Sequence, residues 1–105
     1  MSDIHALLLR LGIPPCSYGF LQTAYAVSLA LEKPEILHHI TKCLYPDVAK
    51  HYHTSAACVE RNIRSAVECA WERRRDLLID LSCGFWEDRP TASEFLAVVV
   101  LELLG

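Results

Sequence analysis

The sequence predicts an all-α fold, a compact bundle of six to seven helices without the strands of a winged helix. Four glycines and five prolines are few for 105 residues, so the stretches between them are long enough for helices. Apolar residues recur within these stretches at the three- and four-residue spacing of a helix face. Helix-capping residues precede several of the stretches, which supports the same fold class.

A chain of 105 residues can bury one hydrophobic core, so residues 1–105 are predicted to form a single domain. The five cysteines are odd in number and include no Cys-x-x-Cys pair, which fits a reducing cytoplasm better than a disulfide scaffold. No signal peptide is visible at the start of the chain. The longest wholly apolar run, residues 95–101, is far too short to span a bilayer. We therefore expect a cytoplasmic protein without a membrane partner.

The first part of the chain is predicted to contain three helices. Ser2 can cap the first, and Gly12 with the two prolines after it ends that helix. The second helix covers residues 18–31 and stops at Pro34. Pro34 then suits the first turn of a third helix, because its missing N–H would be unpaired there in any case. The apolar stripe of this third helix consists of Ile36, Leu37, Ile40 and Leu44.

Residues 46–75 have the pattern of a helix-turn-helix. Pro46 opens a short helix to about Tyr52, a polar turn follows, and a long helix runs from Ala56 to about Arg75. On the long helix, small and branched apolar residues share an arc of about 80° and are expected to face the core. Charged residues lie on the opposite side, a distribution that fits a helix lying in the major groove of DNA. The inner stripe consists of Ala56, Val59, Ile63, Ala66 and Ala70.

Two further helices are predicted after residue 75. A short one carries Leu77, Leu78 and Leu81 and is closed by the Cys83-Gly84 pair, and residues 85–90 form a loop. Residues 91–94 then have the capping-box pattern, which announces a last helix over residues 92–104. This helix is apolar on nearly every side. It is therefore either wrapped by its own domain or docked on another chain.

Charge is unevenly distributed along the chain. The net charge of −3 argues against a protein that coats nucleic acid indiscriminately, because such binding depends on excess lysine and arginine. Residues 42–75 nevertheless carry seven basic and four acidic side chains, whereas the remainder carries three basic and nine acidic ones. This asymmetry predicts one face for a polyanion and another for a different partner.

The candidate base-reading residues are Glu60, Arg61 and Arg64, on the outer face of the long helix. Arginine suits the N7 and O6 acceptors of guanine, and glutamate can accept a hydrogen bond from the amino group of cytosine. The alternative is an ordinary amphipathic helix whose charges pair with each other in water. Residues expected to cross the DNA phosphates surround the turn, and they are Lys50, His51, His53, Thr54 and Ser55.

The three arginines at residues 73–75 allow two interpretations. They could clamp a phosphate at the end of the long helix, with Arg74 and Arg75 as contacts, or they could be cations favoured there by the helix dipole. No metal site is predicted, because His51 and His53 have no close cysteine pair beside them. The sequence also has no glycine-rich phosphate loop and no Gly-x-Ser-x-Gly elbow, so we expect neither an enzyme nor a cofactor.

Two stretches, ITKCLYPDVAK at residues 40–50 and VERNIRSAVECAW at residues 59–71, closely resemble one family. They are similar to the C-terminal DNA-binding domain of stage-zero sporulation protein A, the response regulator of endospore-forming Firmicutes. Shorter agreements at residues 11–14, 18–19 and 90–95 extend the resemblance over almost the whole chain. It implies an all-helical domain that binds short promoter boxes through Glu60, Arg61 and Arg64, with dimer contacts in the C-terminal part.

The chain departs from the family pattern in three places. Ala57 and Cys58 stand where the family has a hydroxyl residue and an arginine, so a polar contact and a charge are lost. The loop at residues 85–90 is shorter, and Arg89, a candidate phosphate contact, replaces a lysine. The family's protein carries an N-terminal receiver domain, whereas this sequence starts directly on the effector domain. It is therefore either a cut-out or a stand-alone relative, and for a stand-alone relative we expect control by abundance, partners or another signal instead of phosphorylation.

Two functional hypotheses follow. In the first, the protein is a sequence-specific transcriptional regulator that binds double-stranded DNA, forms a homodimer through its C-terminal helix, and has RNA polymerase or a cognate regulator as a candidate protein partner. In the second, it is a protein-interaction paralogue that binds or antagonises a cognate regulator without strong DNA binding. The acidic remainder of the chain and the apolar last helix motivate the second hypothesis.

Overall fold

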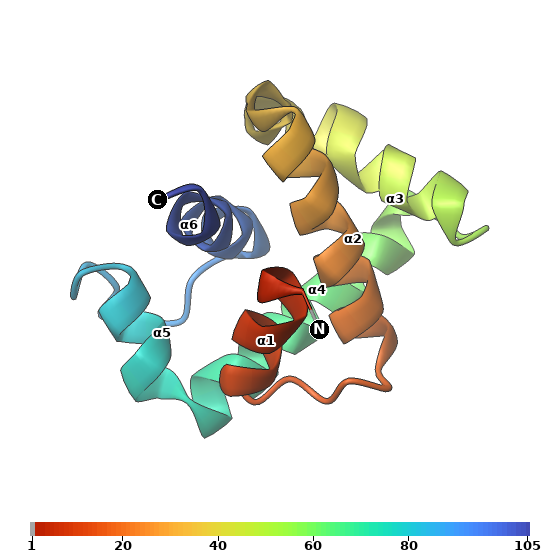
Figure 1. Ribbon diagram of the computed structural model, residues 1–105. Helices are drawn as coiled ribbons and strands as arrows, with labels where there is room; N and C mark the ends of the chain where they lie inside the picture. The colour runs from red at the N-terminus through yellow and green to blue at the C-terminus, as the bar shows by residue number, and fades with distance from the viewer. Residues whose placement is uncertain (1) are drawn as a thin grey trace.

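The computed structural model describes residues 2–105, which form six α-helices and an irregular helical segment, with no strand among them (Figure 1). This confirms the predicted all-α class. The α-helices are α1 (Asp3–Arg10), α2 (Tyr18–Glu32), α3 (Tyr45–His51), α4 (Ala56–Arg73), α5 (Arg75–Leu81) and α6 (Ala92–Leu104). The irregular segment comprises a 3₁₀ stretch η1 (Pro34–His39) and one π turn η2 (Ile40–Leu44).

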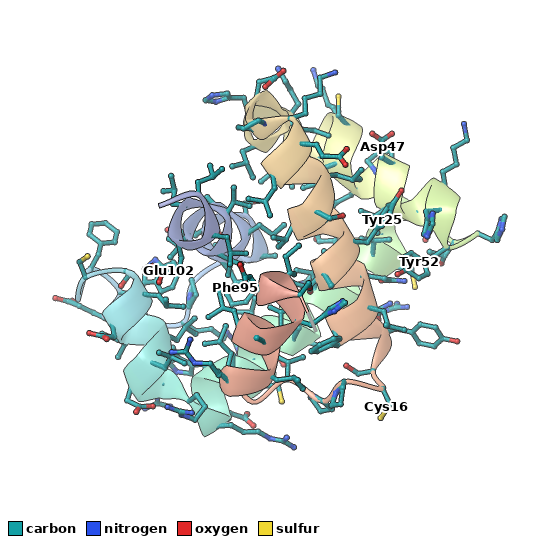
Figure 2. The ribbon with its side chains drawn as sticks, in the orientation of Figure 1. Cys16, Tyr25, Asp47, Tyr52, Phe95 and Glu102 are labelled. Atoms are coloured by element: carbon teal, nitrogen blue, oxygen red, sulfur yellow. The ribbon has the colours of Figure 1, made fainter. Side chains whose placement is uncertain are left out.

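Helix α2 lies at the centre of the arrangement, where it packs against α1, α4 and α6 (Figure 1). In the view of Figure 1, α4 crosses behind α1 and α2, and α6 is seen end-on between α2 and α5. Phe95 of α6 points inward and is fully buried at the middle of the core (Figure 2). Other large side chains that are fully buried come from α1, α4 and α5, namely Leu8, Ile63 and Leu78.

The helix ends follow the capping chemistry of the sequence. Ser2 accepts a hydrogen bond from the His5 N–H at 3.2 Å, as predicted for the start of α1. At the other end of α1, Gly12 has a left-handed φ of +84°, and the Ile13 N–H donates to the Leu8 carbonyl at 3.2 Å. This Schellman arrangement satisfies a carbonyl that the last helical turn leaves unpaired. The capping box before α6 is also confirmed.

The predicted third helix over residues 34–44 is not a regular α-helix. Its stripe is buried or half-buried as expected, but the backbone is 3₁₀ as far as His39 and then widens into a π turn. Pro46 supplies the physical reason. It has no N–H for the carbonyl four residues earlier, and its ring crowds that carbonyl. The wider turn, with the Tyr45 N–H bonded to the Ile40 carbonyl, accommodates the proline and runs directly into α3.

Helix α4 ends at Arg73, two residues before the predicted end at Arg75. Arg74 has a non-helical backbone, with φ −136° and ψ 50°, and α5 starts at the next residue. The Arg74 Nη1 donates to the Arg10 carbonyl at 3.0 Å, and the Arg73 Nη1 donates to the Gly12 carbonyl at 3.2 Å. Contacts to the end of α1 thus accompany the bend between α4 and α5, and no residue spacing in the sequence could show them.

Helix α6 is largely wrapped by its own domain. Five of its side chains are buried against the other helices, whereas Leu101 and Leu104 near the end of the chain are 64% and 53% exposed. Of the two predicted alternatives, packing within its own domain therefore holds over most of this apolar helix, instead of docking on another chain. Of the helices in residues 2–105, none has the length and apolar character needed to cross a bilayer.

Candidate nucleic-acid interface

The turn between α3 and α4 is fixed by backbone hydrogen bonds. The Thr54 N–H donates to the Ala49 carbonyl at 2.9 Å and the His53 N–H donates to the Lys50 carbonyl at 3.4 Å, which together form a Schellman motif. His53 occupies the left-handed position of this motif, with φ +54°. Ser55 then caps α4, because its Oγ accepts the Cys58 N–H at 3.1 Å. The two helices consequently meet in a defined geometry.

The inner face of α4 matches the predicted stripe. Val59, Ile63, Ala66 and Ala70 are buried, and Ala56 is half-buried at the start of the helix. Val67, next to this stripe, is buried as well. The small side chains let α2 approach closely, as the 3.3 Å between an added Gly19 Cβ and the Ala66 Cβ shows. The charged face of α4 is consequently directed away from the core.

Glu60, Arg61 and Arg64 form what we call the reading face, on the outer side of the N-terminal half of α4. Arg64 Nη2 pairs with Glu60 Oε1 at 2.8 Å, one helical turn away, with both side chains about half exposed. Such a pair in water contributes little to stability and can open to meet a ligand. Arg61 is exposed, and its Nη2 lies 3.6 Å from the Cys58 sulfur.

The thiol of Cys58 lies in the first turn of α4, beside the reading face. A hydrogen bond with Thr54 is the largest influence that lowers the pKa of this thiol, and the nearby charge of Arg61 acts in the same direction. Burial opposes these effects but does not outweigh them. The N-terminal end of α4 is therefore an environment that favours negative charge, as expected where unpaired N–H groups and a guanidinium converge.

The candidate phosphate contacts around the turn lie at the same end of α4 as Arg61. Lys50 and His51 occupy the last turn of α3, and His53 and the two hydroxyl residues after it form the connection. All five are exposed. His51 also stacks on Tyr25 of α2, with ring centroids 4.0 Å apart, and Tyr52 meets Tyr25 edge-on (Figure 2). This aromatic contact ties the end of α3 to α2.

Arg89 reaches the middle of α4 from the loop before α6. Its Nη1 lies 3.5 Å from Glu68 Oε1, and Arg89 also lines a hollow of about 400 Å³ together with Glu60 and Arg64. The structure thus brings the loop arginine to the reading face, 25 residues further along the chain than Arg64. The rest of the lining comes from Tyr45 and from the N-terminal end of α6, at residues 90–93.

Tyr45 was not singled out in the sequence, yet it forms one wall of this hollow. Its side chain is 2% exposed, and burial raises the pKa of its hydroxyl despite a hydrogen bond with Ser93 that acts in the opposite direction. The capping box identified the start of α6, but nothing in the spacing of residues showed that this helix end lies against α3 and α4. The contact between Tyr45 and Ser93 is a product of the tertiary fold.

Arg74 and Arg75 lie just beyond the C-terminal end of α4, and the part of the helix from Arg61 to Arg73 is about 18 Å long. The Arg74 side chain is bonded to the Arg10 carbonyl and to Asp76. Arg75 lies over the Trp71 ring, 4.7 Å from its centroid, and donates to the Trp71 carbonyl. The structure does not bring these two arginines together with the turn or the reading face. In residues 2–105, no three histidine, cysteine, aspartate or glutamate side chains gather as metal ligands would.

A family model described as Sporulation initiation factor Spo0A C terminal matches residues 4–103 of the chain. The chain belongs to this family. The match covers nearly every residue, including both helices of the helix-turn-helix and the loop that carries Arg89. The family is the DNA-binding effector domain of a sporulation response regulator and is not an enzymatic family. This confirms the family and fold inferred from residues 40–50 and 59–71.

Proposed function

We propose that this protein is a sequence-specific transcriptional regulator that inserts the N-terminal half of α4 into the major groove of double-stranded DNA. The observation that carries the proposal is the reading face itself. Glu60, Arg61 and Arg64 project from a helix whose opposite side is buried, so base edges can approach them without disturbing the core. Family membership supports DNA as the ligand, and arginine and glutamate supply the donors and acceptors that base edges match.

Phosphate contacts would flank the groove on two sides. Lys50, His51, His53, Thr54 and Ser55 lie at the end of α3 and in the turn before α4, and Arg89 lines a hollow together with Glu60 and Arg64. Arg74 and Arg75 are too distant to touch the same phosphates, so we assign them to a neighbouring stretch of the DNA backbone. Contacts of this kind set the position of the protein on the duplex, whereas sequence is read by the groove contacts.

We also propose that two copies associate on DNA through the exposed end of α6. Leu101 and Leu104 are the large apolar side chains of this helix that are exposed, and a small apolar patch of this kind suits a contact that forms only when DNA holds two copies side by side. RNA polymerase or a cognate regulator is a further candidate partner, and we place the protein in the cytoplasm, where all of these partners are available.

The test measures binding to a duplex enriched by the wild-type protein from a random-sequence library, and to a random duplex of equal length. Arg61→Ala should weaken binding to the enriched duplex by about 1 to 3 kcal/mol and relax base preference at one position, with little effect on the random duplex. Lys50→Ala is the matched control, because Lys50 is exposed and has no ion-pair partner within residues 2–105. It should weaken both duplexes alike and reduce the dependence of binding on salt.

Equal losses on both duplexes for Arg61→Ala would refute the assignment of Arg61 as a base contact. No binding of the wild-type protein to any duplex at low salt and micromolar concentration, together with a stable complex with a cognate regulator on gel filtration, would replace the proposal with the protein-interaction hypothesis.

A further inference from the structure

A line of polar side chains connects the buried side of α2 to the reading face. It begins at Gln22, which is only 2% exposed and whose Oε1 accepts a hydrogen bond from the Asn62 Nδ2 at 3.0 Å. The same Nδ2 lies 3.6 Å from the Cys58 sulfur. Arg61 Nη2 donates to that sulfur from the solvent side, also at 3.6 Å. Consecutive contacts thus connect the buried Gln22, the half-buried Asn62 and the Cys58 thiol to Arg61, one of the two arginines of the reading face.

The bond between Gln22 and Asn62 is the one side-chain hydrogen bond that joins α2 to α4 within residues 2–105. The surrounding contact is close and made of small groups. A Cβ at Gly19 would lie 2.7 Å from the Asn62 carbonyl oxygen, so the two backbones nearly touch there. Apolar contact between small groups has little directional preference, whereas a hydrogen bond in a low-dielectric interior is strongly directional. The amide pair therefore defines which way Asn62 points.

The two arginines of the reading face are held by different means. Arg64 is paired with Glu60 on the helix surface, 2.8 Å apart, and needs no help from the core. Arg61 has no carboxylate partner within residues 2–105, and the sulfur of Cys58 is the side-chain atom that it contacts. The sulfur in turn lies against Asn62, on the next turn of the same helix. The sulfur of Cys58 is thus a contact that Arg61 and Asn62 share.

On the basis of the proposed function, we propose that Asn62, oriented by Gln22, is a positioning residue that determines the specificity of base reading by Arg61. The hydrogen bond from Asn62 to the buried Gln22 holds the Asn62 side chain against Cys58, and the thiol supports the Arg61 guanidinium at the groove. A long side chain that is held in place before binding loses less conformational freedom when it meets a base, and it tolerates fewer wrong bases. Asn62 itself touches no DNA.

The test uses Gln22→Met, which keeps the length of the side chain and removes its acceptor oxygen. The ratio of dissociation constants for the random and the enriched duplex should fall about tenfold, because a well-placed arginine–guanine pair contributes discrimination of that order. The salt dependence of binding should stay unchanged, since no phosphate contact is altered. Asn62→Ala removes the donor at a half-buried position and should have the same effect, so the test does not depend on one variant folding.

A second measurement follows the arginines directly without DNA. In NMR relaxation of the free protein, the Arg61 Nε–H group should become more mobile in Gln22→Met, whereas the Arg64 group in the same sample should not change. Val27→Ala is the stability control, because it opens space at a fully buried position of α2 and leaves the amide pair intact. It should lower thermal stability and leave both the specificity ratio and Arg61 mobility as in the wild type.

An unchanged specificity ratio in both variants, with normal discrimination by the wild type, overturns the proposal. If the wild type does not discriminate between duplexes, the proposed function fails, and the NMR comparison then decides separately whether Gln22 and Asn62 hold Arg61. Equal mobility of Arg61 in wild type and variants overturns the proposal in that case.

Discussion

Replacing Gly19 by alanine tests the close approach of α2 and α4 on which the reading face depends. The added Cβ would lie 2.7 Å from the Asn62 carbonyl oxygen and 3.3 Å from the Ala66 Cβ. The first distance is shorter than a van der Waals contact, and the atom concerned belongs to the helix backbone, so it cannot move aside as a flexible side chain could. Helices α2 and α4 must therefore separate or tilt.

Two effects of opposite sign determine how much Gly19→Ala changes the free energy of unfolding. Overpacking of a well-packed contact costs about 1 to 3 kcal/mol, and alanine gains at most about 1 kcal/mol over glycine in helix propensity. The gain is reduced because residue 19 lies in the first turn of α2. We therefore expect a net loss of about 1 to 2 kcal/mol, which corresponds to a fall in Tm of roughly 5 to 15 °C for a domain of this size.

Thermal unfolding followed by circular dichroism measures the effect. Gly84→Ala is the comparison, because Gly84 has φ +81° but no atom within 4 Å of an added Cβ. Gly84→Ala should lower the free energy of unfolding by about 1 to 2 kcal/mol through backbone strain alone. It should leave discrimination between the two duplexes unchanged. Gly19→Ala should in addition reduce discrimination between the enriched and the random duplex. A Tm for Gly19→Ala at or above that of the wild type would refute the close packing of α2 on α4.

Three further substitutions test the packing of two core residues and the ionisation of the Tyr45 hydroxyl. Thr23→Val should stabilise the protein by about 1 kcal/mol, because the Thr23 hydroxyl is buried without a hydrogen-bond partner among the described residues; a lower urea midpoint would show that the hydroxyl has a partner. Ile63→Ala should cost about 2 to 5 kcal/mol in urea unfolding, because Ile63 is fully buried on α4, and a loss typical of surface positions would contradict this placement. Burial raises the pKa of Tyr45 above 10.0 in the folded state, so its contribution to stability is complete below pH 10 and is lost as the pH rises through the folded-state pKa. Tyr45→Phe should therefore lose less stability between pH 9 and pH 11 than the wild type, as measured by urea unfolding at each pH, and an equal loss in both proteins would contradict the raised pKa.

Local chemistry in the sequence predicted most of the helices correctly. Gly12 ends α1 because its backbone can take the left-handed conformation, and the Thr91 hydroxyl with the Glu94 carboxylate starts α6 by satisfying N–H groups. The inner stripe of α4 was also predictable, because burial on one side of a helix imposes a 3.6-residue period. Each of these features depends on residues within one or two turns of each other.

The predictions that were wrong or incomplete concern effects between distant residues. The end of α4 was predicted at about Arg75 and lies at Arg73. The contacts of Arg73 and Arg74 with the end of α1 span more than 60 residues, so they leave no periodic signal that could place this end more closely. The irregular backbone before α3 was missed because a stripe of buried residues is compatible with 3₁₀ and π turns as well as with an α-helix. The effect of Pro46 on the preceding turn could have been anticipated from its missing N–H.

The sequence by itself determined the helical class, the start and end of most helices, and the identity of Glu60, Arg61 and Arg64 as the polar face of α4, because these depend on short-range spacing and capping. The tertiary structure decided which distant residues stand beside that face. It brings Arg89 and Tyr45 to the same hollow, leaves Arg74 and Arg75 at the far end of α4, and places Gln22 of α2 against Asn62. The physical reason is that packing of whole helices sets these distances, and the energy of such packing is spread over many weak contacts that no short motif records.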